Sequence, residues 1–124
     1  MQNLSILVVE DDADGQAVMA TLLEHMKVNV DIAADAAEAE KFLFQSGKTY
    51  NAAIIDLALP DKNGWEILAE IQAHSQTAHL PCIAVTAYHT SKLREDAITA
   101  GFTAYFAKPV DGTKFLRELD SMLN

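Results

Sequence analysis

Asp56 stands where an apolar run of the sequence gives way to loop residues. Ile54 and Ile55 lead directly into this acid, and Pro60 follows shortly after it. A short apolar run that closes on a carboxylate is typical of a buried parallel strand ending at the carboxyl edge of a sheet. Ligands bind at that edge in open α/β sheets, so Asp56 is a candidate reacting group. Asp56 could equally cap the following helix, and this stretch alone leaves both interpretations open.

Three further apolar runs end in residues that could do chemistry. Residues 4–9 are followed by Glu10 and Asp11, residues 81–85 by Thr86, and residues 103–107 by Lys108. Crowded carboxylates repel each other, so a cluster of these acids predicts a compensating cation. Magnesium fits, because it prefers oxygen ligands and typically binds one or two carboxylates together with phosphoryl oxygens. A lysine and a hydroxyl nearby are suitable partners for a phosphoryl group.

Strand-like and helix-like patterns alternate along the chain. Apolar, β-branched runs predict five strands, at about residues 4–9, 28–33, 52–56, 81–85 and 103–107. Apolar residues at helical spacing predict helices after each strand, at about residues 14–26, 35–46, 64–74, 91–100 and 112–123. Five strand–helix units with short connections predict one doubly wound α/β domain, in which helices cover both faces of a parallel sheet.

Capping residues set the expected ends of these helices. Either Asp12 or Asp14 is available as the N-cap of the first helix, whose apolar residues at helical spacing include Val18, Met19 and Leu23. The second helix begins with a capping-box-like pattern at Asp35 and Glu38, and the last is expected to have Asp111 as its N-cap. Gly47 and Gly101 are expected to end the second and fourth helices.

Length, charge and cysteine content restrict the class of protein. The 124 residues fit one domain, expected over 1–124, and no apolar segment approaches the roughly 20 residues of a membrane span. The net charge of −9 argues against direct DNA binding, which needs a basic face. The single cysteine, Cys82, excludes an intramolecular disulfide and is expected to be a buried thiol. Without a signal-peptide pattern, a cytoplasmic location is expected.

The ordered set of motifs resembles the receiver domain of bacterial two-component response regulators. The matching residues are Val8-Val9-Glu10-Asp11-Asp12, Ile55-Asp56-Leu57-Ala58-Leu59-Pro60, Gly64, Thr86-Ala87, Gly101, Tyr105 and Lys108-Pro109. They follow the family's order and spacing over essentially the whole chain. The resemblance implies a single domain like the chemotaxis regulator, with a flavodoxin-like sheet in the strand order 2-1-3-4-5 flanked by five helices.

The resemblance also assigns roles to the acids. Asp56 would be the phosphoacceptor, whose carboxylate attacks the phosphorus of a phosphohistidine or of a small acyl phosphate. Asp11 and Asp56 would bind Mg²⁺ through their side chains, Ala58 through its backbone carbonyl, and Glu10 through a metal-bound water. Asp12 and Asp61 lie close by in sequence but are expected to be loop or capping acids.

A switch is implied by the remaining motif residues. Lys108 would pair with one phosphoryl oxygen, and Thr86 would donate its hydroxyl to another. Movement of Thr86 would leave space into which Tyr105 could turn, which in the family changes the face of the fourth helix, fifth strand and fifth helix. The Lys108–Pro109 peptide resembles one that is cis in the family.

Two functions follow as expectations. The first is a phosphoacceptor switch that receives its phosphoryl group from a histidine kinase or a histidine phosphotransfer protein and controls a downstream protein. It would not be an enzyme beyond self-phosphorylation from small donors and autodephosphorylation. The alternative is a phosphorylation-independent interaction module with the same fold, which would have no need for a costly acidic cluster. Phosphorylation-dependent dimerisation stays open.

Residues around the expected site bear on the lifetime of a phosphoryl group. Ala58 offers only a methyl, and Tyr88 could shield the phosphoryl group, so we expect slow autodephosphorylation. His89 follows Tyr88 in the loop near the site. The other histidines, His25, His74 and His79, lack metal-ligand spacing and are expected at the surface. Trp65 is expected to pack rather than to dock a partner.

Overall fold

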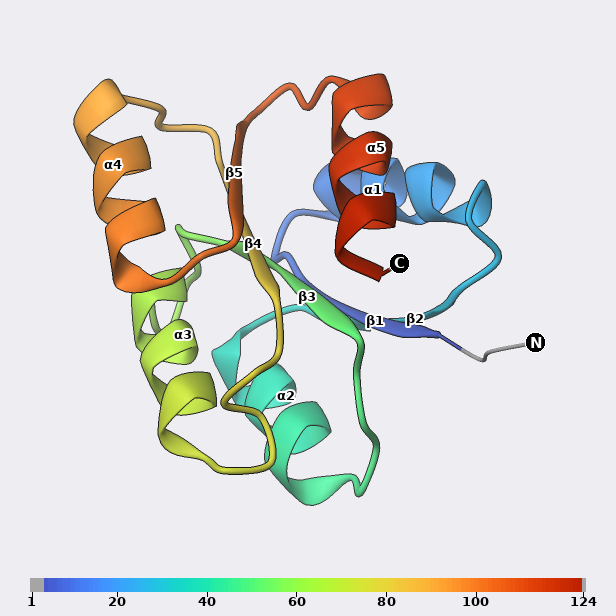
Figure 1. Ribbon diagram of the computed structural model, residues 1–124, viewed down its shortest axis with the longest axis vertical. Coiled ribbons are helices and arrows are strands. Elements are labelled where there is room, and N and C mark those ends of the chain that lie inside the picture. The colour runs from blue at the N-terminus through green and yellow to red at the C-terminus, as the bar shows by residue number, and fades with distance from the viewer. Residues whose placement is uncertain (1–3, 124) are drawn as a thin grey trace.

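A computed structural model describes residues 4–123, which form a five-stranded parallel sheet between two layers of helices (Figure 1). The strands are β1 (Ser5–Val9), β2 (Asn29–Ala33), β3 (Ala52–Asp56), β4 (Cys82–Thr86) and β5 (Ala104–Ala107). Their order in the sheet is β2-β1-β3-β4-β5. This confirms the doubly wound fold and the strand order expected from the sequence.

A helical segment follows every strand. The helices are α1 (Ala13–Glu24), α2 (Ala36–Glu40), α3 (Gly64–Ala73), α4 (Ser91–Ala100) and α5 (Gly112–Leu123). The second helix continues without a break into a π-helical turn over Lys41–Gln45, labelled η1. The sequence pattern gave no sign of this widened turn, since a helical periodicity over so few residues does not distinguish the two forms.

Parallel pairing brings the carboxyl ends of the strands to one edge of the sheet. Val9 of β1 pairs with Ile55 of β3, and Thr86 of β4 pairs with Ala107 of β5. The residues that directly follow these strands therefore start from neighbouring positions at that edge.

Alternate residues of the central strands serve two separate cores. Ile55 and its neighbours on one face pack with α2, α3 and α4, whereas Ile54 and its neighbours on the other face pack with α1 and α5. Residues of both faces are excluded from solvent. Figure 1 shows the central strands between the helical layers. Burial on both faces explains why these strands appear in the sequence as continuous apolar runs rather than as alternating ones.

Most of the expected helix ends are confirmed, with small changes. The N-cap of α1 is Asp12, whose side chain accepts a hydrogen bond from the backbone nitrogen of Gly15. Gly47 and Gly101 follow the second and fourth helices with φ angles of 76° and 121°, a region that favours glycine. Of the apolar residues at helical spacing on α1, Met19 and Leu23 are buried, whereas Val18 is 51% exposed.

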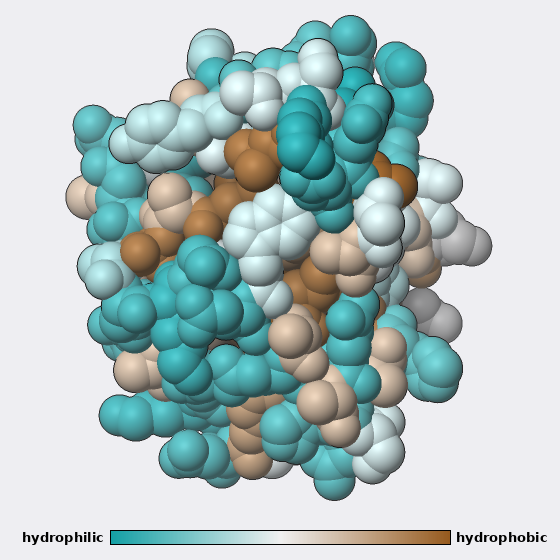
Figure 2. All heavy atoms as spheres, turned by 90° about the vertical axis from the view of Figure 1, so that its left-hand side faces the viewer, coloured by the Kyte–Doolittle hydropathy of each residue, from teal (hydrophilic) through white to brown (hydrophobic). Residues whose placement is uncertain are grey.

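The outer surface is mainly polar. Figure 2 faces the side of the molecule that carries α4 and shows apolar side chains in hollows between polar ones. All four histidines are exposed, as expected, and Cys82 is buried. Over the described residues, no helix is long and apolar enough to cross a membrane.

Candidate functional site

Four strand ends bring polar side chains together at the carboxyl edge of the sheet. Glu10 and Asp56 are only 2% and 4% exposed, and Thr86 is equally buried, which is unusual for such residue types. Carboxylate oxygens of Glu10, Asp11 and Asp56 all lie within 4.8 Å of one another. The acidic cluster expected from the sequence is therefore present.

Lys108 lies between the two buried acids. Its Nζ donates to Oδ2 of Asp56 at 2.8 Å and also forms a short hydrogen bond to Oε1 of Glu10. Burial works to lower the pKa of Lys108, but the hydrogen bonds to Asp56 and Glu10 outweigh it and raise that pKa. Burial in turn raises the pKa of Glu10, an effect that the bond to Lys108 only partly offsets. The lysine thus stays protonated and compensates the crowded carboxylates.

Neighbouring residues of α1 leave room for Glu10 and hold its backbone. The side-chain nitrogen of Gln16 donates to the carbonyl of Glu10 at 2.7 Å. A Cβ on Gly15 would lie 2.3 Å from Oε1 of Glu10, so a larger residue would displace this carboxylate. Neither residue was singled out in the sequence, because only the folded chain shows that the first turn of α1 packs against Glu10.

Backbone contacts fix the loop that follows Asp56. The nitrogen of Ala58 donates to Oδ1 of Asp56 at 2.9 Å, so the loop turns back over the carboxylate. Gly64 begins α3 directly behind it, where an added Cβ would meet the carbonyl of Asp56 at 2.7 Å and Cα of Leu57 at 2.9 Å. Since both obstacles are backbone atoms, this position requires glycine.

Thr86 and Tyr105 lie on neighbouring strands and are both buried. The hydroxyl oxygen of Thr86 accepts from the backbone nitrogen of Tyr88 at 3.0 Å. The hydroxyl of Tyr105 lies 3.0 Å from Nδ1 of His89. Lys108 precedes Pro109 through a cis peptide bond, as the family resemblance implied. Tyr88 itself is 73% exposed.

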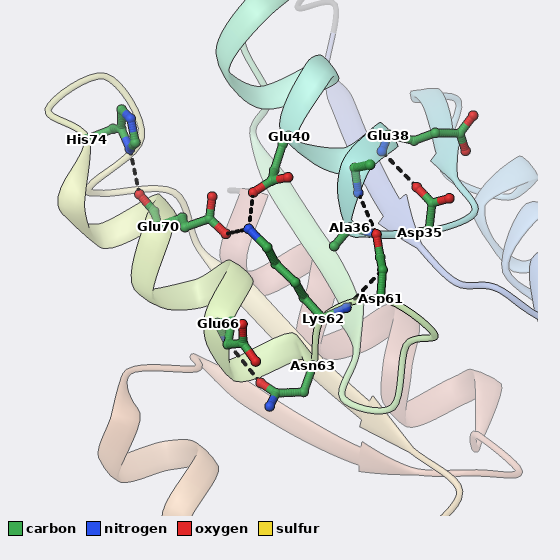
Figure 3. A network of polar contacts seen from close by, with 11 residues as sticks. Asp35, Ala36, Glu38, Glu40, Asp61, Lys62, Asn63, Glu66, Glu70 and His74 are labelled. Carbon is green, nitrogen blue, oxygen red and sulfur yellow. Dashed lines mark hydrogen bonds and ion pairs between the residues drawn. The ribbon is translucent and has the colours of Figure 1, made fainter.

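A second lysine between two carboxylates lies outside this cluster. Nζ of Lys62 contacts Glu40 of α2 at 2.7 Å and Glu70 of α3 at 3.1 Å (Figure 3). Asp61 caps α2, accepting from the backbone nitrogens of Ala36 and Ala37 at 2.9 and 3.0 Å. Asp61 is thus a capping acid, as expected, although it caps a helix that precedes it in the chain.

The donor set of the acidic cluster fits a hard divalent cation. Three carboxylates converge within reach of one ion, two of them buried and one, Asp11, exposed toward solvent. Magnesium prefers oxygen ligands and usually keeps several waters, so an open side at Asp11 suits it. Asp11, Asp56 and Glu10 could hold such an ion.

A comparison with known protein families identifies the family to which this chain belongs. The model of the response regulator receiver domain matches residues 6–120. The chain belongs to the response regulator receiver domain family. Receiver domains are phosphoacceptor switches of two-component signalling rather than enzymes with an external substrate. This confirms the resemblance stated from the motifs.

Individual relatives are between 25% and 33% identical to this receiver domain over the aligned residues. A 14.6 kDa protein of Leptolyngbya boryana is 32% identical over 94% of this chain and 88% of its own length. The response regulator ArlR of Staphylococcus saprophyticus is 33% identical over 95% of this chain, which spans about half, 51%, of that regulator. The chain spans only 13% of the sensor histidine kinase CheAY of Helicobacter pylori, with 25% identity.

Solved structures show the same fold, and one of them contains magnesium. The receiver domain of sensor histidine kinase PA1611 from Pseudomonas aeruginosa is 30% identical, with a TM-score of 0.86 over 98% of each chain. That domain has a magnesium ion coordinated in its active-site cleft. A receiver domain protein from Methanospirillum hungatei is also 30% identical, with a TM-score of 0.82 over 98% of this chain and 94% of that one.

The structure brings most of the predicted site residues together. Glu10, Asp11, Asp56 and Lys108 form one cluster, and Ala58 contacts it through its backbone nitrogen. Thr86 lies at the end of the neighbouring strand, but its hydroxyl bonds to the loop after β4 rather than to Asp56. Sequence reasoning missed the Lys62 cluster and the bond between His89 and Tyr105, since neither follows a motif.

Proposed function

We propose that Asp56 accepts a phosphoryl group from a phosphohistidine and that the charged cluster around it carries out the transfer. The observation that carries this proposal is Lys108 held between two buried carboxylates, an arrangement too costly to serve packing alone. An oxygen of Asp56 would attack the phosphorus, the P–N bond to the donor imidazole would break, and the imidazole would leave with a proton.

The other residues have separate tasks in this reaction. Asp11, Asp56, Glu10 through a water, and the carbonyl of Ala58 would hold Mg²⁺, which would offset negative charge on the phosphoryl oxygens. Lys108 is protonated and already bonded to Asp56, so a small movement would let it pair with a phosphoryl oxygen.

Phosphoryl transfer to Asp56 would act on a protein partner through the surface of α4, β5 and α5. Phosphorylation adds about −1.5 to −2 charges, which would attract the Thr86 hydroxyl away from its bond to the loop. Along β5 lies a groove of about 380 Å³ between α4 and α5. Three cations, Arg94, Lys114 and Arg117, line it together with one acid, Glu118, and this excess of positive charge supports a partner with acidic groups.

The matched relatives support the choice of donor. Three of them are kinases, the CheAY protein and two hybrid signal transduction histidine kinases of Dictyostelium discoideum, to short parts of which this chain is similar. We therefore propose a histidine kinase or a histidine phosphotransfer protein as the donor. Phosphorylation-dependent dimerisation stays a prediction. Slow loss of the phosphoryl group also stays a prediction, because the Tyr88 side chain that was expected to shield it extends into solvent.

Intact mass after incubation with acetyl phosphate and magnesium tests the proposal. We expect one added phosphoryl group in the wild type, none in Asp56→Asn, and none without the metal. Asp61→Asn is the matched control, because it changes a neighbouring acid outside the cluster. If a receiver domain of known activity is labelled under the same conditions and this chain is not, the interaction module without phosphotransfer becomes the better function.

A further inference from the structure

The contact between His89 and Tyr105 joins the loop after β4 to strand β5. Their rings are tilted by 51° with centroids 5.5 Å apart, and Nδ1 of His89 lies 3.0 Å from the Tyr105 hydroxyl. Tyr105 is only 9% exposed and belongs to the core on the side of α2, α3 and α4, whereas His89 is exposed. A surface histidine therefore holds the hydroxyl end of a buried ring.

Thr86 holds the same loop at its beginning. Its hydroxyl oxygen accepts from the backbone nitrogen of Tyr88, and Thr90 caps α4 by accepting from the nitrogen of Leu93 at 3.0 Å. His89 lies between these two fixed points, one residue from each. A displacement of the Thr86 hydroxyl toward Asp56 would weaken its bond to Tyr88 and shift the residue next to His89.

We propose that His89 is the positioning residue through which Tyr105 responds to Thr86. This inference rests on the proposed function and adds to it the contact through which a change at Thr86 reaches Tyr105. Because the Tyr105 ring is already buried, space left by Thr86 is not enough to account for a response. The loop after β4 supplies the link between Thr86 and Tyr105. In its present position His89 holds the Tyr105 ring in the core, and a displacement of the loop changes that contact.

The hydrogen bond does not require one charge state of the histidine. A phenol can donate to a neutral ring nitrogen or accept from a protonated one. Arg94 of α4 is the charged group that acts on Tyr105, and its positive charge works to lower the pKa of that hydroxyl, while burial raises the pKa more strongly. The coupling is therefore a matter of geometry.

Fluorine NMR of protein labelled with 3-fluorotyrosine tests the coupling. The chain has three tyrosines, so Tyr105→Phe assigns the resonance. In His89→Phe, we expect the Tyr105 resonance to move toward that of exposed Tyr88. Loss of one neutral hydrogen bond should change the ratio of buried to exposed states of the Tyr105 ring about fivefold, and the shift should correspond to that change.

The response to a phosphoryl mimic separates positioning from packing. Beryllofluoride with magnesium should shift the Tyr105 resonance in the wild type and less than half as far in His89→Phe. His89→Gln keeps a hydrogen-bonding group and should restore most of both effects. The bound beryllofluoride gives its own fluorine signals, which report occupancy of Asp56 independently of Tyr105.

Three results would overturn the inference. In the first, the Tyr105 resonance of His89→Phe matches the wild type in both states. In the second, it is displaced but responds to beryllofluoride as fully as the wild type, so that His89 only packs. In the third, beryllofluoride binds to the wild type and Tyr105 does not respond. Absence of bound beryllofluoride would instead remove the proposed function, and the coupling with it.

Discussion

Two lysines of this receiver domain each lie between two carboxylates, and their surroundings differ. Lys108 joins Glu10 and Asp56, whose side chains are 3% and 6% exposed, at the carboxyl edge of the sheet. Lys62 joins Glu40 and Glu70, which are 25% and 29% exposed, between two helices. The Lys108 cluster has a large desolvation cost because its charges are removed from water. The Lys62 cluster has a small desolvation cost and contributes little to the free energy of folding.

The pKa shifts of the acids also differ between the two clusters. Glu40 and Glu70 have pKa values that move in opposite directions: the hydrogen bond with Glu70 lowers that of Glu40, and burial raises that of Glu70. Burial raises the pKa of Glu10, although the hydrogen bond to Lys108 works against it. The clusters differ chiefly in how far their carboxylates are removed from solvent, and a deeply buried charged cluster is a candidate functional site.

Removing each lysine tests the comparison most strongly. Without magnesium, Lys108→Met should lower the free energy of unfolding by about 3 kcal/mol, because two buried carboxylates lose their cation. Lys62→Met should have a much smaller effect. Urea unfolding at neutral pH measures both. Added magnesium should recover part of the loss in Lys108→Met only.

Salt provides the control for this pair of variants. Raising the salt concentration from about 0.1 M to about 1 M shortens the Debye length from about 10 Å to about 3 Å. The small loss of unfolding free energy in Lys62→Met should then vanish, while that in Lys108→Met persists. Equal losses in the two variants, or equal sensitivity to salt, would mean that burial does not separate the clusters.

The pH dependence of stability gives a second, smaller test. Because the pKa of Glu10 is higher in the folded than in the unfolded chain, the folded chain holds the proton longer, and stability falls as the pH rises above the ordinary value of 4.5. The stability of Glu10→Gln relative to the wild type should therefore increase from about pH 4 to 7. Urea midpoints in EDTA measure it.

The double variant Glu40→Gln/Glu70→Gln is the matched control for pH. The opposite pKa shifts of these two residues give stability contributions of opposite sign, so the difference from wild type should change less with pH than that of Glu10→Gln over the same window. A slope as large as that of Glu10→Gln would contradict the distinction between the clusters.

Asp61 gives the smallest expected effect. Asp61→Ala removes the acceptor for two backbone nitrogens of α2 and should cost about 1 kcal/mol in urea unfolding, while phosphorylation of Asp56 from acetyl phosphate continues at a rate within about twofold. Asp61→Asn keeps an acceptor oxygen and should lose less. A large loss of phosphorylation in Asp61→Ala would make Asp61 part of the site rather than a cap.

The sequence predicted the elements and the main cluster because both depend on local patterns. Buried parallel strands appear as apolar runs, and Glu10, Asp56, Thr86 and Lys108 directly follow or end those runs, so topology alone brings them together. The family resemblance supplied the strand order, which periodicity does not determine, and the structure confirms it.

Contacts between distant residues could not be predicted in the same way. Lys62 meets Glu40 and Glu70 only because of the angle at which α2 and α3 pack, and His89 meets Tyr105 only because of the shape of one loop. The helical spacing of apolar residues on α1 likewise did not show that Val18 would be exposed, because the apolar stripe of the helix is wider than its buried part. Side-chain geometry of this kind depends on the whole fold.

Three consecutive residues after the acceptor loop fasten one side of the molecule. Asp61 caps α2, Lys62 joins α2 to α3, and Asn63 caps α3 by accepting from the nitrogen of Glu66 at 3.0 Å (Figure 3). On the side of α4, the Tyr105 hydroxyl has one side-chain hydrogen bond among the described residues, with Nδ1 of His89. If Asp56 is phosphorylated as proposed, we expect the side of α2 and α3 to resist displacement and the side of α4 to yield more easily.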